Sequence, residues 1–263
     1  MANNRRQTEK PNPNALPNYQ ALLDSTDWPS LATACGTGES LPATLARLLD
    51  PDPVVRETAA KEALGQVTHQ NTIYEATVPV AQFIAAILDH PAITTGDIGQ
   101  GTVHPTLVGL LEWLSDTAYD ADDERVAIGE RLYGERFLHE YDEMHAFRDL
   151  RPAIFCAIPP LLCHESAEVR DAALVAAVPL AEHPLLAEYR GELVGHAHRL
   201  LDTSSDRHNR DRVLDALKAW GHETSDLENA ADIAARERYA RLMAEHASLE
   251  GDWTGGCSED PPF

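Results

Sequence analysis

The sequence carries little positive charge. Its 263 residues include 43 aspartates and glutamates against 21 lysines and arginines, so the formal net charge is −22 at pH 7. A surface that binds free nucleic acid or an anionic membrane needs clustered positive charge. The composition therefore argues against free nucleic acid and against membranes as the main partners of this chain.

Long apolar runs are missing as well. No stretch approaches the roughly 20 apolar residues that cross a bilayer. The first residues, MANNRRQTEK, contain two arginines with no apolar segment behind them, which is unlike a signal peptide. We therefore expect a cytoplasmic protein.

Cysteine is scarce and widely spaced. The four cysteines are Cys35, Cys156, Cys163 and Cys257, and no two form a C-x-x-C pair. This spacing indicates neither a zinc site nor a disulfide framework. Cys156 and Cys163 lie seven residues apart in an apolar stretch, so we expect two small core residues on one helical face.

Strand patterns are almost absent, since no segment alternates β-branched and polar residues and no Asn-Gly turn occurs. Helical spacing recurs instead, as in residues 41–49, whose leucines share one helical face. Asp52 then offers an N-cap oxygen and Pro53 suits a first helical turn, which predicts a second helix immediately after. Thr72 and Glu75 have the spacing of a capping box and predict a further helix start.

The composition divides the chain into three parts. Residues 1–18 are rich in Asn, Pro and charge, and we expect a disordered lead. Residues 19–247 should form an all-α domain that ends in an amphipathic capping helix near residues 226–246. Residues 248–263 should form a flexible acidic tail.

One sequence pattern repeats along this domain. Residues 48–59 match residues 162–173, because both place Val-Arg and an acidic residue shortly into a second helix. Residues 200–211 contain a looser copy. Helix pairs that repeat at roughly 35–45 residues indicate an α-solenoid, in which each pair buries its apolar face against the next.

The pattern L-L-x-(D/H)-x-(D/S)-x-x-V-R-(E/D)-x-A resembles the HEAT repeat over about residues 28–221. The resemblance implies an armadillo-like α-solenoid of about four helical hairpins. It also implies that Asp52 and Arg56 form a polar ladder within a repeat, and that Arg170 is likewise structural. The run from His69 to Thr77 is further similar to one found in uncharacterised actinobacterial HEAT-repeat proteins.

An acidic segment at residues 112–150 interrupts the repeats. Residues 112–149 contain twelve acidic residues and four arginines. We expect a loop at residues 119–123 and a long helix over residues 124–146. An insertion of this kind often lies on the binding face of a solenoid.

The insertion contains candidate partner-binding residues. Tyr133, Phe137 and Tyr141 follow i, i+4 and i+8 spacing, which predicts one stripe on a helix. The acidic candidates beside them are Glu140, Asp142 and Glu143. Two interpretations stay open: the stripe packs on the solenoid while the acids face water, or the segment forms an electrostatically steered interface with apolar anchors.

A second candidate group lies in the His69–Thr77 run. His69, Gln70, Tyr74 and Glu75 are polar or amphipathic side chains around the predicted helix start. They form either a hydrogen-bonded brace between repeats or a pocket on the concave face for a partner. A catalytic site is a third alternative.

Motifs for other chemistry are lacking. The sequence contains no H-E-x-x-H and no G-x-S-x-G. Asp142 and His145 form a single Asp-x-x-His, whereas a di-iron site needs two such motifs and further carboxylates. The glycine-rich residues 96–101 follow no predicted strand and indicate an ordinary loop. We therefore predict no metal, no cofactor and no catalytic residue.

The expected function is that of a non-enzymatic protein-binding module. The strong negative charge favours an acidic inhibitor or immunity-type protein whose partner is a cationic protein, such as a toxin. The alternative functions are a scaffold for a multiprotein assembly and a HEAT-like enzyme such as a base-excision glycosylase. The glycosylase needs a cationic groove, which the composition argues against. In a further interpretation, the negative charge serves only to keep the protein soluble.

Overall fold

The computed structural model describes the backbone of residues 16–98 and 104–250. The predicted lead at residues 1–18 and tail at residues 248–263 lie mostly outside this part of the chain. Within it, residues 16–18 precede the first helix and residues 248–250 belong to the last one.

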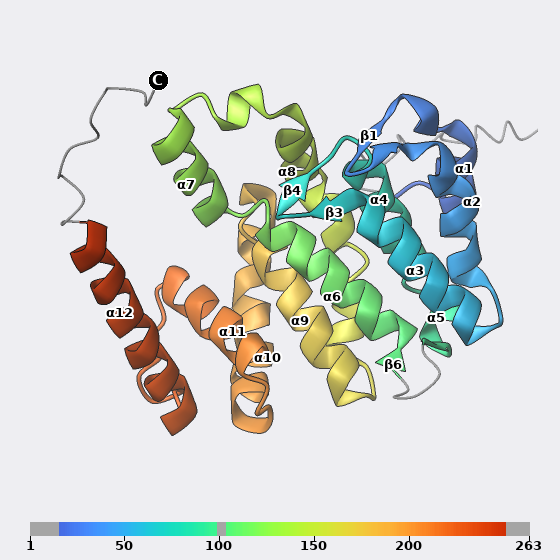
Figure 1. Ribbon diagram of the computed structural model, residues 1–263. Coiled ribbons are helices and arrows are strands. Elements are labelled where there is room, and N and C mark those ends of the chain that lie inside the picture. The colour runs from blue at the N-terminus through green and yellow to red at the C-terminus, as the bar shows by residue number, and fades with distance from the viewer. Residues whose placement is uncertain (1–15, 99–103, 251–263) are drawn as a thin grey trace, which may run out of the picture. The chain divides into compact units, whose positions relative to one another are not determined.

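The described chain is mostly helical, which confirms the predicted all-α class (Figure 1). The α-helices are α1 (Tyr19–Ser25), α2 (Leu41–Ala46), α3 (Pro53–Val67), α4 (Thr77–Ile87), α5 (Pro91–Thr94), α6 (Thr106–Tyr119), α7 (Asp123–Tyr133), α8 (Asp142–Phe155), α9 (Ala167–Leu180), α10 (Arg190–Thr203), α11 (Arg207–Ala219) and α12 (Ala230–Glu250). The 3₁₀ helices are η1 (Trp28–Ser30), η2 (Gly38–Ser40), η3 (Arg47–Leu49), η4 (Leu138–Glu140), η5 (Pro159–Cys163) and η6 (Pro184–Tyr189). Among the described helices, none is both long and apolar enough to cross a membrane.

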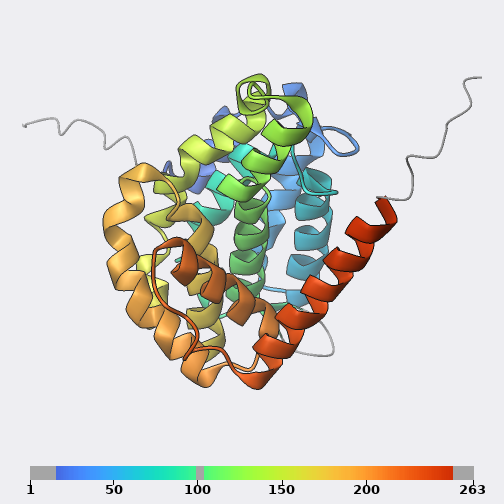
Figure 2. The same cartoon turned by 90° about the vertical axis from the view of Figure 1, so that its left-hand side faces the viewer.

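The chain separates into two compact units, with the division between His196 and Ala197. In the first unit α6 packs on α9, and α4 packs on α8 (Figures 1 and 2). The interior of α9 is buried almost without interruption, from Ala172 to Leu180. Helices α4, α6 and α9 therefore supply a large share of the apolar core of this unit.

Short strands join some of the helices, although strand patterns are almost absent from the sequence. The pairs are antiparallel: β1 (Ala32–Thr33) with β2 (Gly36–Thr37), β3 (Thr68–His69) with β4 (Thr72–Ile73), and β5 (Asp97–Ile98) with β6 (His104–Pro105). The turn of β3–β4 places Gln70 and Asn71 at φ values of 51° and 59°. Positive φ at both central residues is what a tight two-residue hairpin requires.

Two predicted helix boundaries are wrong. Thr72 lies in β4, and the side chain of Glu75 accepts a hydrogen bond from the Ala32 amide at 2.7 Å, so the capping box does not form. The long helix over residues 124–146 is also broken. Helix α7 ends at Tyr133, because Gly134 adopts a φ of 102°, and α8 begins only at Asp142.

An arginine recurs at the fourth position of three helices. In α3, Arg56 is buried and its Nη1 donates to the carbonyls of Asp50 at 2.7 Å and Pro51 at 3.0 Å. In α9, Arg170 makes the equivalent bonds, 2.7 and 2.8 Å long, to the two carbonyls six and five residues earlier. The guanidinium groups thus close the turn before each helix.

The implied ladder between Asp52 and Arg56 does not form. The Asp52 carboxylate instead caps α3 by accepting from the Val54 amide at 2.9 Å. The second nitrogen of the Arg56 guanidinium, Nη2, donates to the carbonyl of Asp97 at 2.5 Å. Arg56 therefore joins two turns through backbone oxygens rather than through a carboxylate.

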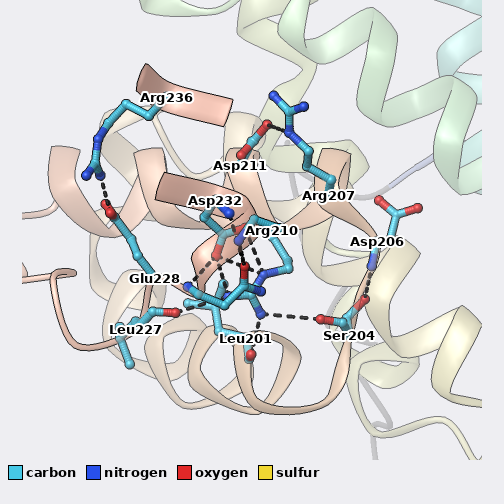
Figure 3. A network of polar contacts seen from close by, with 12 residues as sticks. Leu201, Ser204, Asp206, Arg207, Arg210, Asp211, Leu227, Glu228, Asp232 and Arg236 are labelled. Carbon is cyan, nitrogen blue, oxygen red and sulfur yellow. Dashed lines mark hydrogen bonds and ion pairs between the residues drawn. The ribbon is translucent and has the colours of Figure 1, made fainter. Parts of the chain in front are cut away.

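The second unit contains the third arginine, Arg210 of α11 (Figure 3). Arg210 and Asp232 are both buried, and Arg210 Nη2 lies 2.6 Å from the Asp232 carboxylate. The same guanidinium also donates to the carbonyls of Leu201, Ser204 and Leu227. The hydrogen bonds from Arg210 hold the pKa of Asp232 below its ordinary value, so this pair fastens α12 to α11.

Candidate functional site

Tyr141 connects the two groups of candidate residues. Its hydroxyl donates to the carbonyl of Ile73 at 2.8 Å and accepts from the Ile73 amide at 2.9 Å. Ile73 belongs to β4, so the start of α8 lies along the outer edge of the β3–β4 hairpin (Figure 1). Burial raises the pKa of Tyr141, so the phenol keeps the proton that it donates.

The three aromatic residues of the predicted stripe do meet, although no single helix carries them. The rings of Tyr133 and Phe137 stack with centroids 5.8 Å apart, and Phe137 meets Tyr141 edge-on at 5.8 Å. Phe137 also covers Gly129 of α7, where a Cβ would lie only 2.2 Å from its ring. The aromatic chain therefore folds the segment between α7 and α8 back onto α7.

We call the exposed residues around this junction the hairpin–insertion surface. It comprises the β3–β4 turn and exposed residues from the last turn of α7 to the first residue of α8: His69, Gln70, Asn71, Glu130, Arg131, Leu132, Tyr133, Glu135, Arg136, His139, Glu140 and Asp142. Leu132 and Tyr133 are 64% and 77% exposed, so two large apolar side chains that follow one another in the sequence both lie at the surface. These two residues thus lie in water in a segment that carries both exposed carboxylates and the exposed arginines Arg131 and Arg136.

Apart from Glu140, which belongs to this surface, the sequence-predicted residues described next lie at its margin or outside it. Phe137, Tyr141 and Glu143 are half-buried beneath it. Glu140 is exposed and forms an ion pair with Arg136 at 3.2 Å. Tyr74 is half-buried, and Glu75 binds the Ala32 amide, so Glu75 braces β1 and not the insertion.

A partly buried polar cluster holds the start of α7, and no sequence pattern predicts it. Arg151 of α8 is 1% exposed and donates to the Ala121 carbonyl and to Glu182 Oε2, the latter at 3.3 Å. The same carboxylate oxygen accepts from the Asp123 amide at 3.0 Å. Arg148 Nη2 lies 2.5 Å from the Asp123 carboxylate. We call these residues the polar anchor of α7.

The electrostatics of the polar anchor are set by burial. Burial raises the pKa of Glu182 to about 7, because the loss of water outweighs the attraction of Arg151. The same effect lowers the pKa of Arg151 to about 10 and raises that of Asp122, the N-cap of α7. Burial thus disfavours the charged form of Glu182, Asp122 and Arg151.

No metal-binding arrangement occurs among the described residues. In that part of the chain, no three His, Cys, Asp or Glu side chains lie close enough to hold a metal ion. Cys156 and Cys163 are exposed, so the prediction that they are core residues is wrong. Both follow the end of the regular α8 helix, where the chain turns outward through η5.

Comparisons with models of protein families, with curated proteins and with solved structures gave no match for this chain. The fold and the surface therefore carry the assignment. They define a predominantly helical protein with an acidic segment around α7 that is hydrogen-bonded to the rest of the unit at Asp123 and Tyr141.

Proposed function

We propose that the chain is a non-enzymatic protein-binding module that binds a cationic protein through the hairpin–insertion surface. The most concrete form of this proposal is a cytoplasmic inhibitor or immunity-type protein. The observation that carries it is the exposure of Leu132 and Tyr133 in a segment whose first and last parts, at Asp123 and Tyr141, are hydrogen-bonded to the rest of the unit.

The charge around these two side chains supports a cationic partner. Residues 122–143 contain eight acidic residues and three arginines. Negative potential of this kind speeds the encounter with a positively charged protein. Exposed aromatic and aliphatic side chains then provide the contacts that dominate binding once water is excluded.

The repeated arginines support the further proposal of a HEAT-type solenoid. Arg56 and Arg170 close equivalent turns through backbone carbonyls at the same positions relative to their helices. Such a repeat of sequence and contact is typical of proteins built from stacked helix pairs. A HEAT-type solenoid provides a rigid frame from which an inserted helix can meet a partner.

The proposal is tested by comparative capture from a lysate of the source cells. The baits are the wild-type protein, the double variant Leu132→Ser/Tyr133→Ser, and a control with the exposed pair Leu185→Ser/Tyr189→Ser. We expect the wild type and the control to capture equal amounts of the same cationic protein. The first variant should capture about ten-fold less of it. Equal capture by all three baits, or a captured protein that is acidic, refutes the proposal.

A further inference from the structure

Helix α12 is fixed at its start and exposed from there on. At the start, the buried carboxylate of Asp232 binds Arg210 of α11, and Ala235 is buried one turn later. Every residue from 236 to 245 is exposed, so a stretch of about three helical turns is exposed on every side. Figure 2 shows this part of α12, in red, extending beyond α11.

The exposed part of α12 carries an apolar face. Tyr239, Leu242 and Met243 follow i, i+3 and i+4 spacing, which places them on one side of the helix. Their exposed fractions are 64%, 49% and 52%. The same side begins against α11, because Ala235 and Tyr239 line a hollow together with Leu214 of that helix. A helix in water depends mostly on the packing of such a face, so we expect another element to cover its continuation.

The charges beside this face are complementary to those of a second, antiparallel copy. Arg238 and Glu245 lie seven residues apart, so both flank the apolar face on the same side. A two-fold axis between Tyr239 and Leu242 packs these two side chains of one copy on those of the other. The same axis brings Arg238 of each copy against Glu245 of the other, and charges beside an apolar seam set the orientation of paired helices. In a parallel pair, equal residues lie at the same level, so Arg238 and Glu245 stay two turns apart.

The charge of the exposed turns also argues against a cationic protein as the occupant of this face. Residues 236–245 contain three arginines and two glutamates, in a chain whose formal net charge is −22. A cationic partner is therefore attracted to the acidic segment around α7 and not to these turns. Because two crossing helices touch over only a few turns, their contact should bury less than about 1,200 Å², which is typical of weak association.

We propose that α12 forms the contact of a weak, two-fold symmetric dimer of this protein. The Tyr239–Met243 faces of two copies pack antiparallel, and Arg238 of each copy pairs with Glu245 of the other. This contact uses none of the residues of the hairpin–insertion surface, so it is independent of the proposed function.

The first test follows the mass of the full chain by sedimentation equilibrium from about 5 to about 200 μM, the range in which weak interfaces associate. Physiological salt screens the repulsion between the two acidic chains beyond about 8 Å. The wild type should shift from the mass of one chain toward that of two. Tyr239→Ser/Leu242→Ser should associate at least about ten-fold more weakly. The matched control, Leu132→Ser/Tyr133→Ser, removes an equally exposed apolar pair and should dimerise like the wild type.

The second test uses charge reversal to examine the antiparallel arrangement. Arg238→Glu places like charges together twice across the contact, and so does Glu245→Arg. Each variant alone should therefore associate at least about ten-fold more weakly than the wild type. An equal mixture of the two variants should recover the wild-type association, because each pair across the contact then joins opposite charges. Mixing cannot repair a folding defect, so this recovery distinguishes a contact between copies from a role within one chain.

Three results would overturn the proposal. The first is a wild type that stays monomeric at the highest concentration. In that case, protection of the α12 amides from hydrogen exchange would show that the chain covers the face itself, and exposed amides would leave the face to a different protein. The second is equal dimerisation of Tyr239→Ser/Leu242→Ser and the wild type, because another surface then forms the contact. The third is a mixture of Arg238→Glu and Glu245→Arg that associates no better than either variant alone.

Discussion

At Arg56 the geometry of the side chain explains why arginine occupies this position. Its guanidinium reaches the carbonyls of Asp50, Pro51 and Asp97 from two nitrogens at once. A lysine ammonium has no such fork and cannot hold two turns in the same fixed geometry. The recurrence of the contact at Arg170 indicates that backbone oxygens, not carboxylates, select the residue.

Replacing Arg56 with alanine should therefore destabilise the protein. Because Arg56 is 4% exposed and its three acceptors would lose their donor, we expect the free energy of unfolding to fall by about 1–3 kcal/mol. Urea unfolding measures the loss. Arg47→Ala is the control, since the exposed Arg47–Glu62 pair should contribute less than about 1 kcal/mol. Equal losses for the two variants would refute a structural role for Arg56.

Tyr141 offers a second test at the scale of one residue. Tyr141→Phe keeps the ring contact with Phe137 but removes the hydroxyl that binds both backbone groups of Ile73. We expect a loss of about 1 kcal/mol and faster hydrogen exchange at the Ile73 amide. Tyr133→Phe, at a site that is 77% exposed, should change neither quantity. Unchanged exchange at Ile73 in Tyr141→Phe would contradict the assigned contact.

At the scale of elements, local sequence patterns predicted what local contacts decide. Asp52 and Pro53 open α3 as their residue types indicate, because an N-cap needs only neighbouring amides. The spacing of Glu75 and Thr72 predicts a capping box between them. The Glu75 carboxylate instead accepts from the amide of Ala32, which is 43 residues away. The spacing of residue types along the sequence does not predict a contact over this separation. Gly134 likewise ends α7 in a stretch whose helical spacing continues past it.

Substitutions at Asp52 can distinguish the observed N-cap contact from the Asp52–Arg56 ladder that the HEAT resemblance implies. Asparagine can still accept from the Val54 amide, whereas alanine cannot. We expect Asp52→Ala to lower the stability by about 1 kcal/mol and Asp52→Asn by less than about half of that. Thermal unfolding of both variants measures the difference. Equal losses would mean that the charge of Asp52 matters, as in a pair with Arg56.

In the candidate site, too, the features that depend on neighbouring residues could be predicted, and the contacts between residues far apart in the sequence could not. Its acidic and aromatic residues could be predicted from the sequence, because their composition and spacing stand out. The polar anchor could not, because Glu182 and Asp123 are 59 residues apart and neither is unusual in its own segment. Leu132 was missed for a different reason: in the predicted helix it had no distinguishing pattern, and its exposure follows from the break at Gly134.

For the whole molecule, the excess of negative charge should govern association with a cationic partner. Reversal of Glu140, Asp142 and Glu143 to lysine should slow association and flatten its salt dependence, because long-range attraction is screened by salt. The measurement is the association rate with the captured partner at low and high ionic strength.

The control for this prediction changes the net charge equally elsewhere. Glu165, Glu168 and Glu188 are exposed residues outside the hairpin–insertion surface. If the two triple reversals slow association to the same extent, total charge governs the encounter and the insertion is not the steering surface. The search for an interface would then move to His69 and Tyr74.

The contact between Tyr141 and Ile73 also has a consequence for the order of folding. It is a polar contact, and the buried residues of the neighbouring helix α7 are Val126 and Gly129 alone, so little apolar area favours the early fixing of this segment. The helices that supply the core should therefore assemble first, and α7 should become fixed last. Arg131 and Arg136 lie between the two attachments and are exposed. Trypsin should cut there first and leave two fragments that stay together, because each keeps its own attachment to the core.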